Sequence, residues 1–111
     1  MANSFKTYAS QSIGTTPMKV GDHLVAAATT ETLIGLTASN RTAAAINVDV
    51  IHENSANTYT YIVKNAPVPS GSALTPIGGD QKLVITTNEA IRITSNTASS
   101  VDAIMSVLEQ T

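Results

Sequence analysis

The feature that most constrains this fold is the alternation of apolar and polar residues in short runs. In the run 44–52, the side chains of Ile46, Val48 and Val50 fall on one side of an extended chain, and mostly polar residues fall between them. A period of two residues is typical of a β-strand with one buried face, because successive side chains of a strand point to opposite faces. We therefore predict a strand here, and the same pattern recurs along the chain.

Turn-forming sequences separate these runs at intervals of about 8–12 residues, which is typical of a β-sandwich or small barrel. We predict an all-β fold, a single antiparallel, jelly-roll-like β-sandwich of about 7–8 short strands. The last run also fits helical spacing, but we favour a strand because the rest of the chain forms sheets. The expected strands are Met18–Ala28 (broken at Gly21-Asp22), Thr32–Ala38, Ala44–His52, Thr58–Lys64, Ser72–Pro76, Gln81–Thr86, Ala90–Ser95 and Val101–Glu109.

The same patterns predict the core and some of the connections. Residues 53–57 form a polar loop that would close a hairpin. Gly78-Gly79-Asp80 is a turn sequence. Pro67 and Pro69 suggest a stiff connection, since proline cannot lie inside a central strand. We expect most of the following residues to be buried in the core: Leu33, Ile34, Leu36, Ile46, Val48, Val50, Leu83, Ile85, Ile91 and Ile93.

Residues 1–16 are mostly polar, and we interpret them as an extended N-terminal arm that precedes a β-sandwich domain of residues 17–111. Phe5, Tyr8 and Ile13 are the sizeable apolar side chains of this arm. The arm has two alternatives: it closes over its own sandwich, or it docks on a neighbouring subunit. We favour the neighbour, because an extended arm lets a small protein reach adjacent copies in an assembly.

The charge of the chain is low, and this bears on its partners. Charged residues make up 13% of the 111 residues, against the usual share of about 25%. Neutral polar residues line an interface without the desolvation cost of a charge, so we interpret the surface as one that becomes covered in an assembly. A small, weakly charged monomer is the alternative. The six Lys and Arg residues are scattered and the net charge is −2, so we expect no binding to nucleic acid or to an anionic membrane surface.

No part of the sequence predicts an enzyme, a metal site or a cofactor. The chain has no Cys, and no strained nucleophile turn is evident. His23 follows Asp22, and His52 precedes Glu53. Adjacent strand residues point to opposite faces, so neither pair is a natural chelate. The GGDQK sequence at 78–82 lacks the full spacing of a phosphate loop and precedes a strand.

Tyr59 and Tyr61 fall on one face of an expected strand. Such a pair can stack a sugar, but it more often packs against the edge of a core. A receptor- or glycan-binding adhesin is therefore an alternative to an assembly module. The candidate interface residues of the chain are Phe5, Tyr8, Ile13, Tyr59, Tyr61, Pro67 and Pro69.

Several stretches resemble small virion structural proteins of tailed bacteriophages, which are frequent in marine and cyanobacterial phages. They are YTYIVKNAPVPSGSAL at 59–74, GGDQKLV at 78–84, IGLTASNRTAAAINVDV at 34–50 and ASSVDAIMSVLE at 98–109. The resemblance implies a β-sandwich on the particle exterior or in the tail, and it carries over no functional residue.

We therefore expect a non-enzymatic virion protein that binds copies of itself, as a homo-oligomer, and a larger virion protein. A capsid decoration (cement) protein bound to the major capsid protein ranks first. A tail, neck or baseplate component is the close alternative. The start of the chain has no apolar stretch behind a basic head, so we expect no signal peptide and synthesis in the host cytoplasm.

Overall fold

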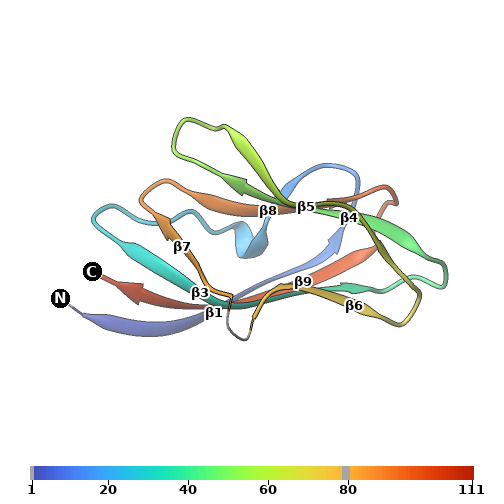
Figure 1. Cartoon of the computed structure of the whole chain (residues 1–111), viewed down its shortest axis with the longest axis horizontal. Coiled ribbons are helices and arrows are strands. Elements are labelled where there is room, and N and C mark those ends of the chain that lie inside the picture. The colour runs from blue at the N-terminus through green and yellow to red at the C-terminus, as the bar shows by residue number, and fades with distance from the viewer. Residues whose placement is uncertain (1, 79–80) are drawn as a thin grey trace.

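The alternating runs form β-strands that pair into two antiparallel sheets facing each other (Figure 1). The computed structural model describes residues 2–78 and 81–111. One sheet has the order β1-β9-β3-β6, with β7 also paired to β3, and the other has the order β2-β8-β4-β5. The strands are β1 (Asn3–Ile13), β2 (Met18–Lys19), β3 (Thr30–Asn40), β4 (Ile46–Glu53), β5 (Tyr59–Val68), β6 (Ala73–Ile77), β7 (Leu83–Thr86), β8 (Ala90–Ser95) and β9 (Val101–Gln110).

This arrangement confirms the predicted all-β sandwich. With β7 set aside, the remaining strands form two four-stranded sheets in the order of a jelly roll. The last run is a strand, β9, which pairs with both β1 and β3 and removes the helical alternative. The predicted hairpin is β4–β5, closed by a loop after Glu53. Of the predicted turn at 78–80, only Gly78 lies within the described residues, where it forms a bridge with Gln81.

The core lies between the two sheets, and eight of the ten predicted core residues are buried in it. The prediction that most of these residues are buried is confirmed, and Ile34 and Leu83 are the exceptions. Ile34 is 36% exposed because it follows the inward-pointing Leu33, and the irregularity between Leu33 and Gly35 then returns Leu36 to the inner face. Leu83 is only half-buried, since it begins a short strand that pairs on one side with β3.

The predicted N-terminal arm is instead the edge strand β1 of the molecule's own sandwich. Residues 3–13 pair antiparallel with β9 along almost their whole length, and Ile13 at the end of the strand is fully buried. The boundary at residue 16 and the preference for a neighbouring subunit were therefore wrong. Burial of Ile13 and the ladder with β9 offset the cost of ordering this polar segment within one chain.

The expected strand 18–28 is much shorter than predicted. β2 ends at Lys19 and is followed by a single 3-10 turn, η1 (Val20–Asp22). Gly21 has a φ of 66°, and a Cβ placed on it would lie 2.7 Å from the Cβ of Tyr8. This position therefore requires glycine, because the turn packs closely on β1.

The prolines of the expected stiff connection divide between a strand and a turn. Pro67 lies inside β5, opposite Asn47, so the prediction that this segment is a connection was wrong. β5 is the outer strand of its sheet, and an edge strand tolerates a residue that cannot donate a hydrogen bond.

The part of the chain that the structure describes contains no helix with the length and apolar character needed to span a membrane.

Candidate functional site

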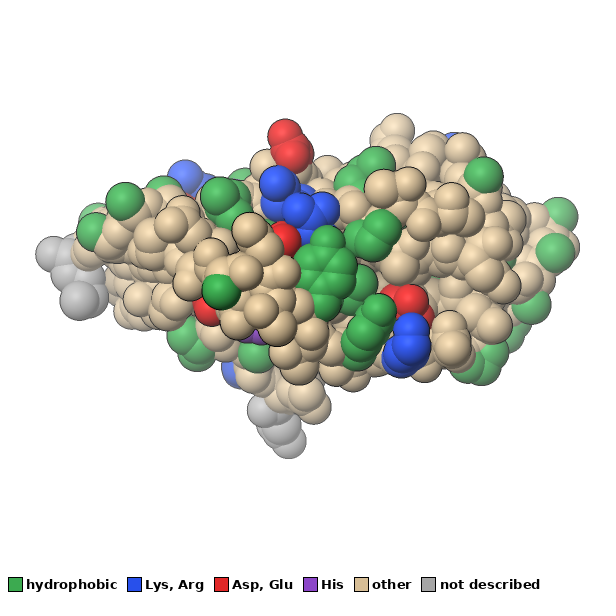
Figure 2. All heavy atoms as spheres, turned by 90° about the horizontal axis from the view of Figure 1, so that it is seen from above, with side chains coloured by type: hydrophobic (Ala, Val, Ile, Leu, Met, Phe, Trp, Pro, Cys, Tyr) green, Lys and Arg blue, Asp and Glu red, His purple; other side chains and the backbone are tan. Residues whose placement is uncertain are grey.

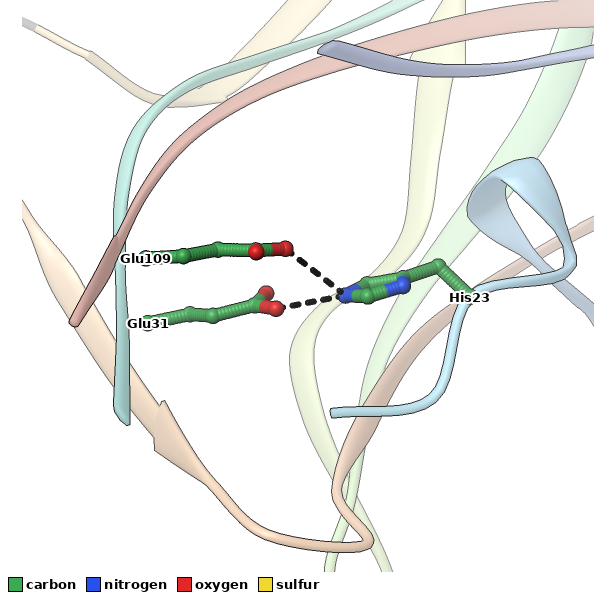
Figure 3. Close-up of side chains that lie close together, drawn as sticks. All are labelled: His23, Glu31 and Glu109. Atoms are coloured by element: carbon green, nitrogen blue, oxygen red, sulfur yellow. Dashed lines mark hydrogen bonds and ion pairs between the residues drawn. The ribbon is translucent and has the colours of Figure 1, made fainter. Parts of the chain in front are cut away.

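One end of the sandwich contains a cluster of His23, Glu31 and Glu109, which come from three separate segments (Figure 3). Glu31 on β3 and Glu109 on β9 are direct partners in the β3–β9 ladder, so their side chains share the inner face of the sheet. His23 follows η1, and its ring reaches toward both carboxylates from the other side. The close packing of η1 on β1 positions this histidine.

The three side chains are near enough to act as one group. His23 Nε2 lies 2.6 Å from Glu31 Oε2 and 3.9 Å from Glu109 Oε2. The ligand atoms of all three residues lie within 4.8 Å of one another. Glu31 is fully buried, whereas the side chains of His23 and Glu109 are each 13% exposed. The cluster therefore opens to solvent on the side of His23 and Glu109.

Two residues of β1 complete the surroundings of the cluster. The Tyr8 hydroxyl donates a hydrogen bond of 2.5 Å to Glu109 Oε2, and the Tyr8 ring stacks on His23 with centroids 3.7 Å apart. Lys6 Nζ lies 3.3 Å from Glu109 Oε1. The edge strand thus supplies a positive charge and a hydrogen-bond donor to Glu109, and the cluster in turn holds β1 in place.

The electrostatics differ between the two carboxylates. Burial raises the pKa of Glu31, the hydrogen bond with His23 opposes this, and the nearby Glu109 raises it further. Burial also acts to raise the pKa of Glu109, but the hydrogen bond from Tyr8, the adjacent Glu31 and the contacts with Lys6 outweigh it and leave that pKa lowered. Burial raises the pKa of Tyr8 as well, and the adjacent Glu109 adds to the shift. Two like charges that face each other on neighbouring strands are costly unless a proton or cation lies between them.

Glu31 has one oxygen without a partner. Among the described residues, Glu31 Oε1 is the one buried side-chain oxygen or nitrogen atom that makes no hydrogen bond. Figure 3 shows that this oxygen, which carries no dashed line, lies on the side of Glu109. A buried carboxylate oxygen without a partner costs free energy, and such an atom in a folded protein calls for an explanation.

The acidic residues that flank the two histidines in sequence are not their partners in the fold. His23 contacts Glu31 and Glu109 and not Asp22, while His52 Nε2 lies 3.4 Å from Glu89 Oε1 and not next to the carboxylate of Glu53. Glu53 instead forms an ion pair of 2.7 Å with Arg92. Sequence reasoning missed Glu31 and Glu109, because they are far from His23 in sequence and only the register between β3 and β9 brings them together. The signal in the sequence that could have found them was a charged residue at an inward-pointing position of each of these strands.

The candidate interface residues are scattered over the molecule. Ile13 is in the core, and Tyr8 is half-buried in the cluster, so neither is available to a partner. Phe5 is 76% exposed on the outer face of its sheet, and Tyr59 and Tyr61 are exposed on the opposite sheet. Pro67 and Pro69 are also exposed, near the end of the edge strand β5.

The outer face of the β1-β9-β3 sheet carries apolar side chains and almost no charge. The register places Phe5, Leu108, Thr32 and Val84 in one row across four strands. Phe5 is 76% and Val84 56% exposed, and Ile104 on the same face is 51% exposed. Among the residues that the register assigns to this face, Asp102 alone is charged, and Arg41 pairs with it at 2.9 Å near one end.

The opposite face carries the tyrosines among charged groups. Figure 2 looks onto this face and shows hydrophobic side chains at its middle, between two groups of basic and acidic side chains. Lys64 Nζ lies 4.2 Å from the centre of the Tyr61 ring, and Arg92 lies 5.9 Å from that of Tyr59. Ile51, the ladder partner of Tyr61, is buried on this face. The tyrosines therefore cover an apolar residue and contact cations, and no pocket lies beside them in the part of the chain that the structure describes.

Comparison with known proteins gives a likeness of fold. No family model and no curated protein matches the chain. A solved structure from work titled "Bacillus endospore appendages form a novel family of disulfide-linked pili" is similar, with a TM-score of 0.57 and 11% identity. The likeness covers 99% of this chain and 87% of that chain. At this identity it supports the fold alone, and the disulfide link has no counterpart in a chain without Cys.

Proposed function

We propose that this chain is a structural protein of a bacteriophage particle, and first of all a capsid decoration protein. The phage assignment is supported by the resemblance of the stretches at 34–50, 59–74, 78–84 and 98–109 to small virion proteins. The observation that carries the assembly role is the partly apolar outer face of the β1-β9-β3 sheet, on which the register places Asp102 as its one charged residue. Its occupant is a larger virion protein.

The size of this face suits a specific interface. The strands β1, β9 and β3 are 10 or 11 residues long, and the short strands β6 and β7 pair with successive parts of β3. At a strand spacing of about 4.8 Å, this sheet makes a flat area of roughly 650 Å². A typical stable interface buries about 800 Å² on each partner. The face also has the make-up of such a surface, since charged residues are depleted at interface centres and aromatic residues are enriched. Ile104 supplies exposed apolar surface on the inner strand β9, and Phe5 supplies it on the edge strand β1.

Analogy of fold adds weaker support. Jelly rolls are common in viral capsid domains, and the distant neighbour in the comparisons belongs to an assembled appendage. The same fold also serves lectins, so the argument rests on the surface and not on the topology. The adhesin alternative receives less support, because Tyr59 and Tyr61 contact cations and border no pocket in the described chain.

The test places a charge on the proposed face and asks whether the protein still joins particles. Ile104→Lys should leave the circular dichroism spectrum and melting temperature nearly unchanged, because the side chain is half-exposed. The same variant should fail to bind phage particles assembled without the protein, because a lysine would be desolvated in the interface. Met18→Lys is the matched control, a residue of similar exposure on the other sheet that should bind normally.

Two results would contradict the proposal: purified particles that contain none of this chain, or particles that incorporate the Ile104 variant as well as the wild type. Copy number then separates the alternatives within the proposal. A number comparable to that of the major capsid protein means decoration of the head. A much smaller number means a neck, tail or baseplate position.

A further inference from the structure

We propose that His23, Glu31 and Glu109 bind one divalent transition-metal ion, of which Zn²⁺ is the representative. The sequence alone argued against a role of this kind for His23, because its acidic neighbour in the chain points elsewhere. The fold supplies two other carboxylates at the same imidazole. The proposal does not depend on the assembly role.

The donor set matches the chemistry of such ions. One imidazole nitrogen and two carboxylate oxygens are ligands that Zn²⁺ accepts, and a site with three protein ligands leaves its fourth position to water. Two ligand atoms bound to Zn²⁺ at about 2.1 Å in tetrahedral geometry lie about 3.4 Å apart. The contact between His23 and Glu31 is 2.6 Å and that between His23 and Glu109 is 3.9 Å. The first distance is about 0.8 Å shorter and the second about 0.5 Å longer than this ideal, and the ligand atoms of all three residues lie within 4.8 Å of one another, so a metal ion requires shifts of up to about 1.4 Å.

An independent observation points into the same space. Glu31 Oε1 is buried without a hydrogen-bond partner, and it lies on the side of Glu109 (Figure 3). A second carboxylate stands directly opposite on the next strand, so the cluster holds two acidic groups and an unused oxygen. A cation bound between them gives that oxygen a partner and removes the repulsion between like charges.

The surroundings also resemble those of a metal site. The Tyr8 hydroxyl donates to Glu109 Oε2 and the Tyr8 ring stacks on His23, so one residue orients two of the three ligands. Supporting contacts of this kind hold ligands in place in known metal sites. Lys6 contacts the other Glu109 oxygen and takes up part of its charge. Solvent reaches the cluster at His23 and Glu109, which provides an entry path.

A bound ion joins four segments at this end of the sandwich. Its ligands come from β3, β9 and the loop after η1, and Tyr8 and Lys6 link β1 to them. The ion therefore stabilises the edge strand against separation from the sheet. Ligands that bind only the folded state raise the melting temperature in proportion to the logarithm of their concentration.

The experiment measures zinc in the purified full chain. Protein is stripped with a chelator, mixed with equimolar ZnCl2 and desalted, and bound metal is determined by mass spectrometry. The wild type should retain one Zn²⁺ per chain and melt at a higher temperature than the stripped form. His23→Gln and Glu31→Gln should retain none. When Co²⁺ is added in place of Zn²⁺, these variants should not show the visible absorption that the wild type shows.

Two further variants serve as controls. His52→Gln removes a histidine that faces one carboxylate, Glu89, and should retain zinc as the wild type does. Tyr8→Phe keeps the ligands and should lower the affinity about 10–100-fold in calorimetry. Glu31→Gln removes a buried charge without changing side-chain size, so it provides a folded variant if His23→Gln does not fold.

The proposal is overturned if the stripped wild type retains no zinc and its melting temperature does not change, which would leave a shared proton as the occupant of the cluster. It is equally overturned if the His23 and Glu31 variants retain as much zinc as the wild type. The assembly proposal is unaffected by either result, because it is tested with Ile104 on the opposite face of the sheet.

Discussion

Replacement of Ile13 by alanine tests whether the first strand belongs to its own sandwich. The Ile13 side chain is 0% exposed and lies at the end of β1 opposite Val101. Truncation of a buried isoleucine costs about 2–5 kcal/mol from lost burial and the cavity that remains. For a domain of this size, each kcal/mol lowers the melting temperature by about 4 °C, so we expect a decrease of about 8–20 °C.

Phe5→Ala on the same strand is the matched control. Phe5 is 76% exposed, and its truncation should change stability by less than about 0.5 kcal/mol. Both variants are measured by urea unfolding and thermal melts, followed by circular dichroism, at a concentration where light scattering shows monomers. If monomeric Ile13→Ala has the same melting temperature as the monomeric wild type, β1 is anchored by another subunit, and the assignment of this strand to its own core is refuted.

Two other substitutions test the core and a polar contact at the sheet ends. Val48→Asp should prevent folding, because Val48 is 1% exposed and an unpaired charge would enter the core; a native circular dichroism spectrum of this variant would contradict the predicted burial. Glu89→Gln should lower the melting temperature near neutral pH, because burial acts to raise the pKa of Glu89 but hydrogen bonds from Thr86 and His52 outweigh it and lower that pKa. Because the pKa of Glu89 is lower in the folded state than the unfolded value of 4.5, the ionised side chain stabilises the folded state above pH 4.5, and this stabilisation is lost as the pH falls through the folded pKa. The difference in melting temperature between the variant and the wild type should therefore disappear in acid, and a difference independent of pH would refute this account.

The strands could be predicted from the sequence wherever one face alone is buried. Val48, Val50, Ile91 and Ile93 alternate with polar residues, and each lies in the core at its expected place. The alternation shifts by one residue between Leu33 and Leu36, and the local irregularity that causes this shift cannot be read from residue types. It also says nothing about β1, whose side chains are mostly exposed on both faces and therefore give no apolar period.

The cluster at His23 could not be predicted, for a different reason. Glu31 and Glu109 meet because of the register between β3 and β9, and that register depends on the whole topology. His23 joins them because a tight turn at Gly21 packs on Tyr8. Local patterns show which residues point inward, but they do not show which inward residues face each other.

The pairing of the first and last strands brings the two ends of the chain together. The backbone N–H of Ala2 donates to the carbonyl of Thr111 at 3.2 Å, and that of Thr111 donates back at 3.0 Å (Figure 1). A linker of a few residues would therefore join the ends without strain, and the β4–β5 loop, exposed at Ser55 and Ala56, offers a place to open new ones. A circularly permuted chain should keep the sandwich. Any cargo fused at that loop would then project from the opposite sheet, away from the face that carries Ile104.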